Sequence, residues 1–197
     1  MVLNNYLNIL ISGIGGQGII TLSRVIAEAA VSDNINAIVS ETHGLSQRGG
    51  SVEVHLRIGD VYAPLIPKGE ADILLSMEII EAARNISYLR DHGVAITSDT
   101  ILRPAIPGVK IPKKEDIINE FSRNKISLYI IPARELSEKA GSYLTENMVL
   151  LGALYKIGKL YRFISEDSIR KTISSLRNPE LNLKAYKLGA DFCFNNC

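Results

Sequence analysis

Short apolar runs along the chain alternate with stretches of helical periodicity, which is typical of an α/β protein. Residues 7–12 form an apolar run, and after a glycine-rich turn Ile19, Leu22 and Ile26 recur at the spacing of one helix face. A second apolar run follows at residues 37–40. A strand, a helix and a strand in this order predict a βαβ unit, and therefore a sheet with parallel strands.

A strictly alternating segment interrupts this regular pattern. Residues 51–58 alternate apolar with polar side chains, so the polar positions, His55 among them, are expected to be half-exposed. Gly59 and Asp60 favour a turn, and residues 61–66 are expected to return as the partner strand of a hairpin. The predicted strands span residues 7–12, 37–40, 51–58, 61–66, 71–76, 93–97 and 126–131. The predicted helices span residues 19–32, 77–88, 115–124, 134–140, 148–160 and 179–194, with a further helix beginning at Ser165.

In the last third of the chain the pattern becomes helical throughout. We expect a Rossmann-like α/β fold with a mostly parallel, mixed sheet that contains the inserted hairpin. A single domain is predicted over residues 1–197, with the sheet portion at 1–132 and a C-terminal helical portion at 133–197. The helix at 148–160 is apolar on nearly all sides, which predicts burial within the domain or under a partner. Gly152 in its interior lowers the helix propensity, so a close approach of another helix is expected there.

Composition and charge exclude several classes of function. The 197 residues are 46% hydrophobic and 22% charged with a net charge of +1, so no nucleic-acid or membrane partner is predicted. The chain start has no basic region or cleavage site, and no apolar run reaches about 18 residues, so we expect a cytoplasmic protein. Cys193 and Cys197 are too few for an iron–sulfur cluster. They are expected to be incidental thiols, with a disulfide as the alternative.

The glycine-rich turn after the first strand is the first candidate site. A helix that starts directly after such a turn presents unpaired amides and the positive end of its dipole, which attract an anion or polar ligand. The predicted binding residues are Gly13, Gly15, Gly16, Gln17 and Gly18. The spacing also fits a dinucleotide fingerprint, for which Glu41 stands about 20 positions beyond the glycines. A tight strand–helix connection without a ligand is a third interpretation of the same glycines.

The second candidate site is the polar, glycine-rich segment at residues 41–50, which follows the second strand. In an open parallel sheet this edge carries the ligand, and the segment is expected to lie beside the first glycine turn. Arg48 is able to clamp a carboxylate or phosphate through two nitrogens, or else to pair with Glu41 or Glu53. His43 belongs to this segment. The histidines and cysteines show no metal-ligand spacing, so no metal site is predicted.

Four motifs, in order along most of the chain, carry a resemblance to one protein family. They are Gly13-Ile-Gly-Gly-Gln-Gly18, Glu41-Thr-His-Gly-Leu-Ser-Gln-Arg-Gly-Gly-Ser51, Gly69-Glu-Ala-Asp72 and Asn147-Met-Val-Leu-Leu-Gly-Ala153. The chain resembles the gamma-type subunits of the 2-oxoacid:ferredoxin oxidoreductases. Its length and motifs are most similar to the beta subunit in the indolepyruvate ferredoxin oxidoreductase branch. The second motif is much more specific than a glycine turn.

The resemblance implies a subunit of a complex that oxidatively decarboxylates a 2-oxoacid, of the indolepyruvate or arylpyruvate type. It implies that thiamine diphosphate, magnesium and iron–sulfur clusters lie in a larger partner subunit. Ferredoxin would accept the electrons, and the acyl group would pass to coenzyme A. This chain would then bind no cofactor alone, be inactive alone, and place His43, Ser46, Gln47 and Arg48 toward the partner's active site.

Other interpretations of the chain stay open. Asn147 stands just before the apolar helix, and a capping role is favoured over a catalytic one. A free-standing NAD(P)-dependent Rossmann oxidoreductase is the first alternative function. A purely structural adaptor subunit is the second.

Overall fold

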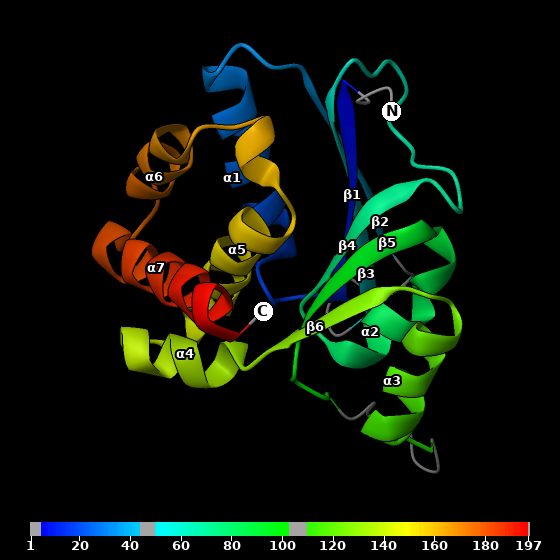
Figure 1. The fold of residues 1–197 in the computed structure, drawn as a ribbon. Helices are drawn as coiled ribbons and strands as arrows, with labels where there is room; N and C mark the ends of the chain where they lie inside the picture. Colours follow the sequence, from blue (N-terminus) through cyan, green and yellow to red (C-terminus); the bar gives the residue numbers. More distant parts are fainter. Residues whose placement is uncertain (1–4, 44–49, 103–109, 197) are drawn as a thin grey trace.

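A computed structural model describes residues 5–43, 50–102 and 110–196, and within these ranges six strands form one sheet between two layers of helices (Figure 1). The sheet order is β2-β3-β1-β4-β5-β6. The strands are β1 (Tyr6–Ile14), β2 (Ala37–His43), β3 (Ser51–Gly59), β4 (Ala71–Ser76), β5 (Leu89–Ser98) and β6 (Ser127–Ile131). The predicted mixed α/β fold is confirmed.

In this part of the chain β3 is the one strand that runs against the others, and it lies between β1 and β2. β1, β4, β5 and β6 are parallel neighbours. The predicted hairpin partner of β3 is wrong, because residues 61–66 contain no strand. Both edges of β3 are already paired with β1 and β2, and Pro64 has no amide to offer a further ladder. The segment packs over the sheet instead, where Ile66 joins the apolar core.

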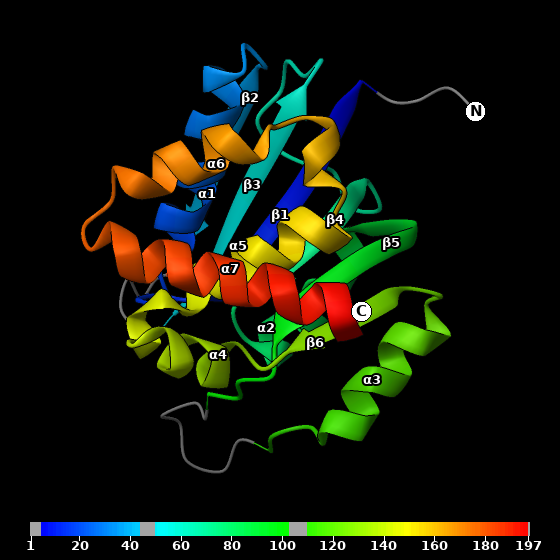
Figure 2. The same cartoon turned by 60° about the vertical axis from the view of Figure 1, so that its left-hand side comes forward.

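The helices form a large layer on one face of the sheet and a small layer on the other. They are α1 (Ile19–Ser32), α2 (Ile79–Arg84), α3 (Lys114–Arg123), α4 (Ala133–Ala140), α5 (Glu146–Ile157), α6 (Glu166–Ser174) and α7 (Pro179–Asn196), with 3-10 turns η1 (Ile86–Tyr88), η2 (Tyr143–Thr145) and η3 (Leu160–Arg162). α2 and α3 cover one face, and the other five α-helices cover the opposite face (Figures 1 and 2). Each layer buries its own apolar cluster. Among the described residues no helix is both long and apolar enough to cross a membrane.

The apolar helix α5 is buried and packs against α7, as Figure 2 shows. A Cβ atom added at Gly152 of α5 would overlap the carbonyl oxygen of Tyr186 on α7. In the reverse direction, a Cβ atom at Gly189 of α7 would overlap the carbonyl oxygen of Val149 on α5. The close helix approach predicted at Gly152 is confirmed, and the second helix contributes a glycine of its own.

His55 is buried, not half-exposed as the alternation predicted. Its side chain lies on the face of β3 that the segment at 61–66 covers, and 3% of the residue is accessible to solvent. Its Nδ1 accepts the backbone N–H of Ile66 at 3.1 Å, and its ring meets Tyr88 edge-on. Burial lowers the pKa of this imidazole, because the charged form loses its hydration.

Candidate functional site

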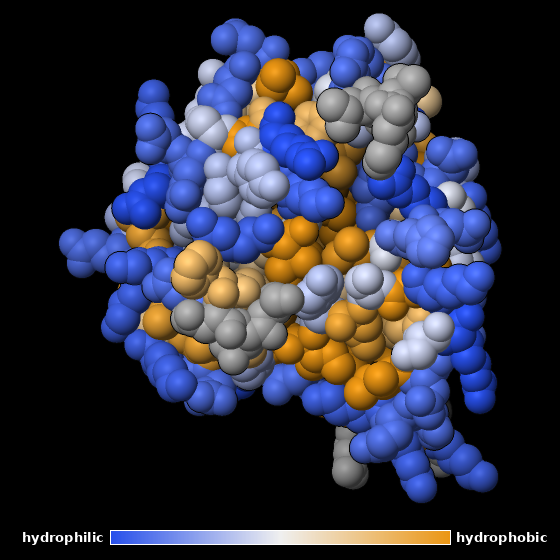
Figure 3. Space-filling view, viewed as in Figure 1, coloured by the Kyte–Doolittle hydropathy of each residue, from blue (hydrophilic) through white to orange (hydrophobic). Residues whose placement is uncertain are grey.

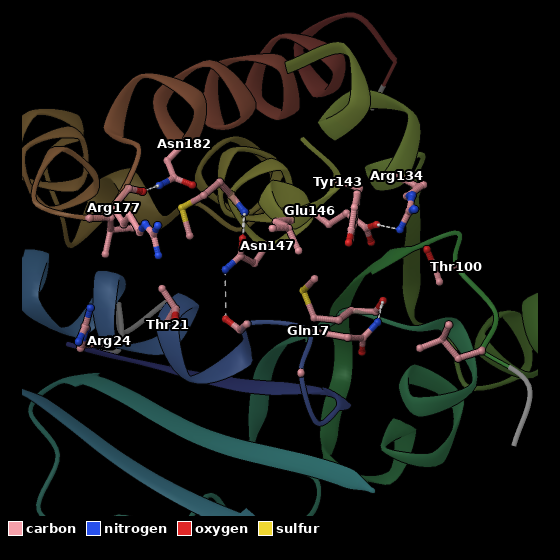
Figure 4. A pocket seen from close by; sticks show the side chains of 17 residues that line it. Gln17, Thr21, Arg24, Thr100, Arg134, Tyr143, Glu146, Asn147, Arg177 and Asn182 are labelled. Atoms are coloured by element: carbon pink, nitrogen blue, oxygen red, sulfur yellow. Dashed lines mark hydrogen bonds and ion pairs between the residues drawn. The ribbon is translucent and has the colours of Figure 1, made fainter. Parts of the chain in front are cut away.

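A pocket of about 500 Å³ opens at the carboxyl ends of the parallel strands. Its walls come from the turn after β1, from Met77 after β4, from Thr100 and Leu102 after β5, and from Arg134 after β6. The start of α5 and the connection between α6 and α7 form the opposite wall (Figure 4). Ligands of open α/β sheets bind outside the carboxyl ends of the strands, so this pocket occupies the expected position for a site.

The glycine turn forms the floor of this pocket. Gly18 precedes α1 in the left-handed region, with φ 76°, and no side chain caps the helix. A Cβ atom at Gly18 would lie 2.6 Å from Asn147 Nδ2, so a larger residue is excluded by space as well as by backbone conformation. The first amides of α1 therefore lie next to the pocket without a capping side chain, together with the positive end of the helix dipole.

Three further hydrogen bonds hold the turn in shape. Gln17 Oε1 accepts the backbone N–H of Ile14 at 2.7 Å, and Gln17 Nε2 donates to the carbonyl oxygen of Met77 at 3.2 Å. Gly15 donates its N–H to the carbonyl oxygen of Gly50 at 2.9 Å. The end of the second glycine-rich segment therefore touches the first, as predicted. The Gln17 side chain therefore links the turn to Met77, the residue that follows β4.

Asn147 connects the turn to the helical layer. It lies within the first turn of α5, where Nδ2 donates to the carbonyl oxygen of Gly18 at 3.2 Å and Oδ1 accepts the N–H of Met148 at 2.9 Å (Figure 4). Only 7% of the residue is exposed. The predicted capping position is wrong, because α5 begins at Glu146 with Thr145 as its N-cap residue, and Asn147 lies inside the helix. Its contacts instead join α5 to the strand–helix turn.

Arginines give the pocket a positive charge. Arg24 and Arg177 lie toward one end of it and Arg134 toward the other (Figure 4). Arg134 pairs with Glu138 at 3.0 Å and Glu146 at 3.1 Å and lies over the ring of Tyr143. Arg24 has a longer, exposed contact with Glu28 at 3.6 Å. Arg177 has no carboxylate within ion-pairing distance among the described residues.

Sequence reasoning missed these three arginines. They come from α1, from α4 and from the connection between α6 and α7, so no short motif contains more than one of them. Among the described lining residues Glu146 is the one carboxylate; its side chain is 12% exposed, and burial raises the pKa of this carboxyl while Arg134 opposes the shift. With that acid paired to Arg134, Arg177 and the start of α1 leave the pocket suited to an anion.

Residues 8–192 match the family described as pyruvate ferredoxin/flavodoxin oxidoreductase. The chain belongs to this family. It is 43% identical over 190 residues to the indolepyruvate oxidoreductase subunit IorB of Archaeoglobus fulgidus, covering 93% of each chain. It is 36% identical over 196 residues to the IorB subunit of Thermococcus kodakarensis, and 28% identical over 185 residues to the 2-oxoglutarate synthase subunit KorC of Methanothermobacter marburgensis, covering 92% of this chain and 93% of each relative.

Solved structures of this oxidoreductase family share the fold. The gamma subunit of a keto/oxoacid ferredoxin oxidoreductase from Geobacter sulfurreducens superposes with a TM-score of 0.72 at 23% identity, covering 96% of this chain and 99% of that one. A 2-oxoglutarate:ferredoxin oxidoreductase from Magnetococcus marinus superposes with a TM-score of 0.74 at 20% identity, over 99% of this chain and 32% of that chain. The same fold thus occurs both as a separate small subunit and as about a third of a longer chain.

The second predicted loop of this oxidoreductase subunit is only partly described. Ser46, Gln47 and Arg48 lie outside the described residues. His43 is the last residue of β2, where its backbone pairs with Val52 of β3, and Gly50 resumes the chain beside the glycine turn. The contacts expected of His43, Ser46, Gln47 and Arg48 therefore stay a prediction.

Glu41 occupies a position that does not suit the dinucleotide interpretation. It pairs with Val54 of β3, and β3 in turn pairs with β1, so two strand spacings of about 5 Å each separate Glu41 from the first strand. In the dinucleotide fold the acidic residue ends the strand directly beside the glycine turn. Insertion of β3 between β1 and β2 removes that neighbourhood.

Metal-binding chemistry has no candidate in the described part of the subunit. The described residues contain no group of three or more His, Cys, Asp or Glu side chains placed to hold a metal ion. Cys193 is a buried thiol on α7, and Cys197 lies outside the described residues. The expectation of two incidental thiols therefore stays a prediction.

Proposed function

We propose that this chain is the small subunit of a cytoplasmic 2-oxoacid:ferredoxin oxidoreductase that acts on indolepyruvate or a similar arylpyruvate. Identities of 36 to 43% with IorB subunits, against 26 to 28% with KorC subunits, support the aromatic substrate class. Thiamine diphosphate, magnesium and the iron–sulfur clusters belong to a larger partner subunit, and ferredoxin accepts the electrons. In this scheme residues 1–197 act as one domain.

The positively charged pocket is the observation that carries the proposal for the site. Coenzyme A bears a diphosphate and a ribose phosphate, and it is the co-substrate that receives the acyl group. The uncapped start of α1 offers backbone N–H groups to a phosphate, and Arg177, which has no ion-pair partner among the described residues, offers its guanidinium in the same pocket. We assign the phosphate groups of coenzyme A to this pocket.

The chain's own contribution to the reaction is then binding and orientation. Thiamine diphosphate, held by the partner, supplies the cleavage of the carbon–carbon bond. Phosphate contacts at the α1 terminus and Arg177 anchor coenzyme A, which orients its thiol toward the partner. In this proposal His43, Ser46, Gln47 and Arg48 line the partner's active site.

Two variants of the assembled complex test this assignment. We expect Arg177→Ala to raise the KM for coenzyme A by about tenfold or more, because a hydrogen bond to a charged group is worth about 1.5–3 kcal/mol. The KM for the 2-oxoacid should change little. Arg48→Ala should lower oxidation by the complex while the subunit stays folded and assembled.

The matched control is Arg123→Ala, which removes an exposed arginine from the far end of α3. The KM for coenzyme A, the KM for the 2-oxoacid and the turnover should all stay normal in that variant. Normal Michaelis constants and turnover in the Arg177 and Arg48 variants would overturn the assigned roles. Loss of assembly alone would point to a structural adaptor, and turnover with NAD(P) by the solitary chain would point to a free-standing oxidoreductase.

A further inference from the structure

A second cavity lies at the opposite end of the sheet, where the parallel strands begin. It measures about 460 Å³ and is bordered by the first residues of β1 and by β4, β5, the end of α5 and η3. Small-molecule sites have volumes of about 300–1,000 Å³. The full length of the parallel strands separates this cavity from the coenzyme A pocket.

The base of this second cavity is apolar. Ile73, Val94, Ile157 and Phe163 line it, and each belongs to or packs against the main apolar core. Gly158 lets the end of α5 approach β4, because a Cβ atom there would lie 2.8 Å from Ile73 Cδ1. The base therefore suits an apolar group.

The rim of the cavity is cationic. Arg90, Lys159 and Arg162 give it positive charge, with His92 beside them, and Asp72 is the one carboxylate among the described lining residues. Asp72 is satisfied on both oxygens: Oδ1 pairs with Arg90 at 2.8 Å, and Oδ2 accepts the N–H of Asn8 at 2.7 Å.

Lys159 and Arg162 keep their charges uncompensated. Neither has a carboxylate within ion-pairing distance in residues 5–43, 50–102 and 110–196. The carbonyl groups at the end of α5 offset about half a charge. The rim thus stays net positive.

The backbone at this rim is unusual as well. His92 and Lys159 both have left-handed conformations, with φ 59° and φ 56°, although neither is glycine or asparagine. The pairing of β4 with β5 is also irregular there, because Ala71 pairs with Leu89 and Ile73 with Val94, so β5 carries three extra residues between these two pairs. Residues held in sparsely populated backbone regions cluster at ligand sites.

We propose that this second cavity binds a small organic anion of about mononucleotide size, whose phosphate or carboxylate contacts Lys159 and Arg162 and whose apolar group lies on Ile73 and Phe163. The proposal is independent of the function assigned to the first pocket. An organic phosphate and an aromatic carboxylate share this chemistry, and the probes below separate them.

Calorimetric titration of the full chain with adenosine 5′-monophosphate, phenylacetate and inorganic phosphate tests the proposal. We expect saturable binding of one organic probe, tighter than that of inorganic phosphate and weakened by added salt. Tighter binding of the nucleotide identifies the ligand as an organic phosphate, and tighter binding of phenylacetate identifies it as an aromatic carboxylate. Inorganic phosphate binding as tightly as both organic probes would overturn the proposal.

The double variant Lys159→Ala/Arg162→Ala should weaken binding of that probe at least tenfold. The control Arg123→Ala/Lys125→Ala removes the same charges at the end of α3, and Lys125 is also left-handed, with φ 56°. Both variants therefore bear the same backbone strain, and a melting curve of each checks that it is folded. Unchanged binding in the first variant, or equal weakening in both, would overturn the proposal.

Discussion

At the scale of single residues, burial sets the protonation of His55, which its neighbours in the sequence do not reveal. The residue alternates with apolar positions as a solvent-facing side chain would, yet the segment at 61–66 covers it. Its neutral Nδ1 accepts the Ile66 amide, an interaction that a protonated imidazole cannot make. The bond therefore exists only while His55 is uncharged.

We expect the stability of the chain to depend on pH through this residue. The folded pKa of His55 is lowered from its ordinary value of 6.5, so below that pH the unfolded chain binds a proton that the folded chain excludes. The free energy of unfolding should then fall by at most about 1.4 kcal/mol per pH unit as the pH decreases below 6.5. Above that value His55 contributes no slope.

Urea unfolding of the wild type and of His55→Gln between pH 7.5 and pH 5 measures this effect. Glutamine keeps an acceptor but does not titrate. Asp72, Glu78 and Glu146, whose carboxyl pKa values are raised chiefly by burial, act in the opposite direction, but they are common to both proteins. A wild type and a variant with parallel pH profiles would contradict the prediction.

At the scale of elements, the contact between α5 and α7 depends on a pair of glycines that face each other's backbone. In an isolated helix, replacing glycine by alanine stabilises by about 1 kcal/mol. At Gly152 the new methyl group would meet the backbone of α7, and at Gly189 it would meet the backbone of α5. Packing therefore makes the substitution by alanine destabilising, whereas helix propensity alone predicts that it stabilises.

We expect Gly152→Ala to destabilise the chain by about 2 kcal/mol or more, because two buried helices have to move apart. Gly189→Ala should behave alike, and the double variant should cost less than the sum of both, since one displacement relieves both overlaps. Ser174→Ala, at an exposed position of α6, should stay close to the wild type. Midpoints of urea unfolding give all four values, and a stabilised Gly152→Ala would refute this account.

At the scale of the whole molecule, exposed apolar side chains surround the anion pocket. Leu144 is 74% exposed and Ile20 is 47% exposed, and both lie close to the pocket, Leu144 in its wall and Ile20 in the first turn of α1. Further apolar surface gathers in the middle of the face seen in Figure 3. Because the function proposed above requires a larger partner, we assign the pocket rim to the contact with it.

Replacing Leu144 by Asp should weaken assembly with that partner. The control Leu65→Asp alters a side chain that is 55% exposed on the segment after β3, away from this edge. Co-purification of the tagged subunit with its partner, followed by the absorption of the iron–sulfur clusters, measures assembly. Equal recovery of the partner with both variants would show that the contact lies on another face.

The local periodicity of the sequence was enough to predict every strand of the sheet, most helices and the buried nature of α5, because each depends on neighbouring residues, although it also predicted a strand at residues 61–66 that does not form. The same holds for the glycine turn, whose shape requires glycine at Gly18. The motifs also indicated the family. Those parts of the structure need no information about which segments meet in space.

Tertiary structure decided everything that joins distant segments. β3 inserts between β1 and β2, which leaves residues 61–66 to cover His55 rather than to pair as a strand. Arg24, Arg134 and Arg177 meet in one pocket although more than 40 positions separate each from the next along the chain. Strand order and pocket charge follow from the packing of whole elements, and the free energy of that packing is shared among residues that no local pattern connects.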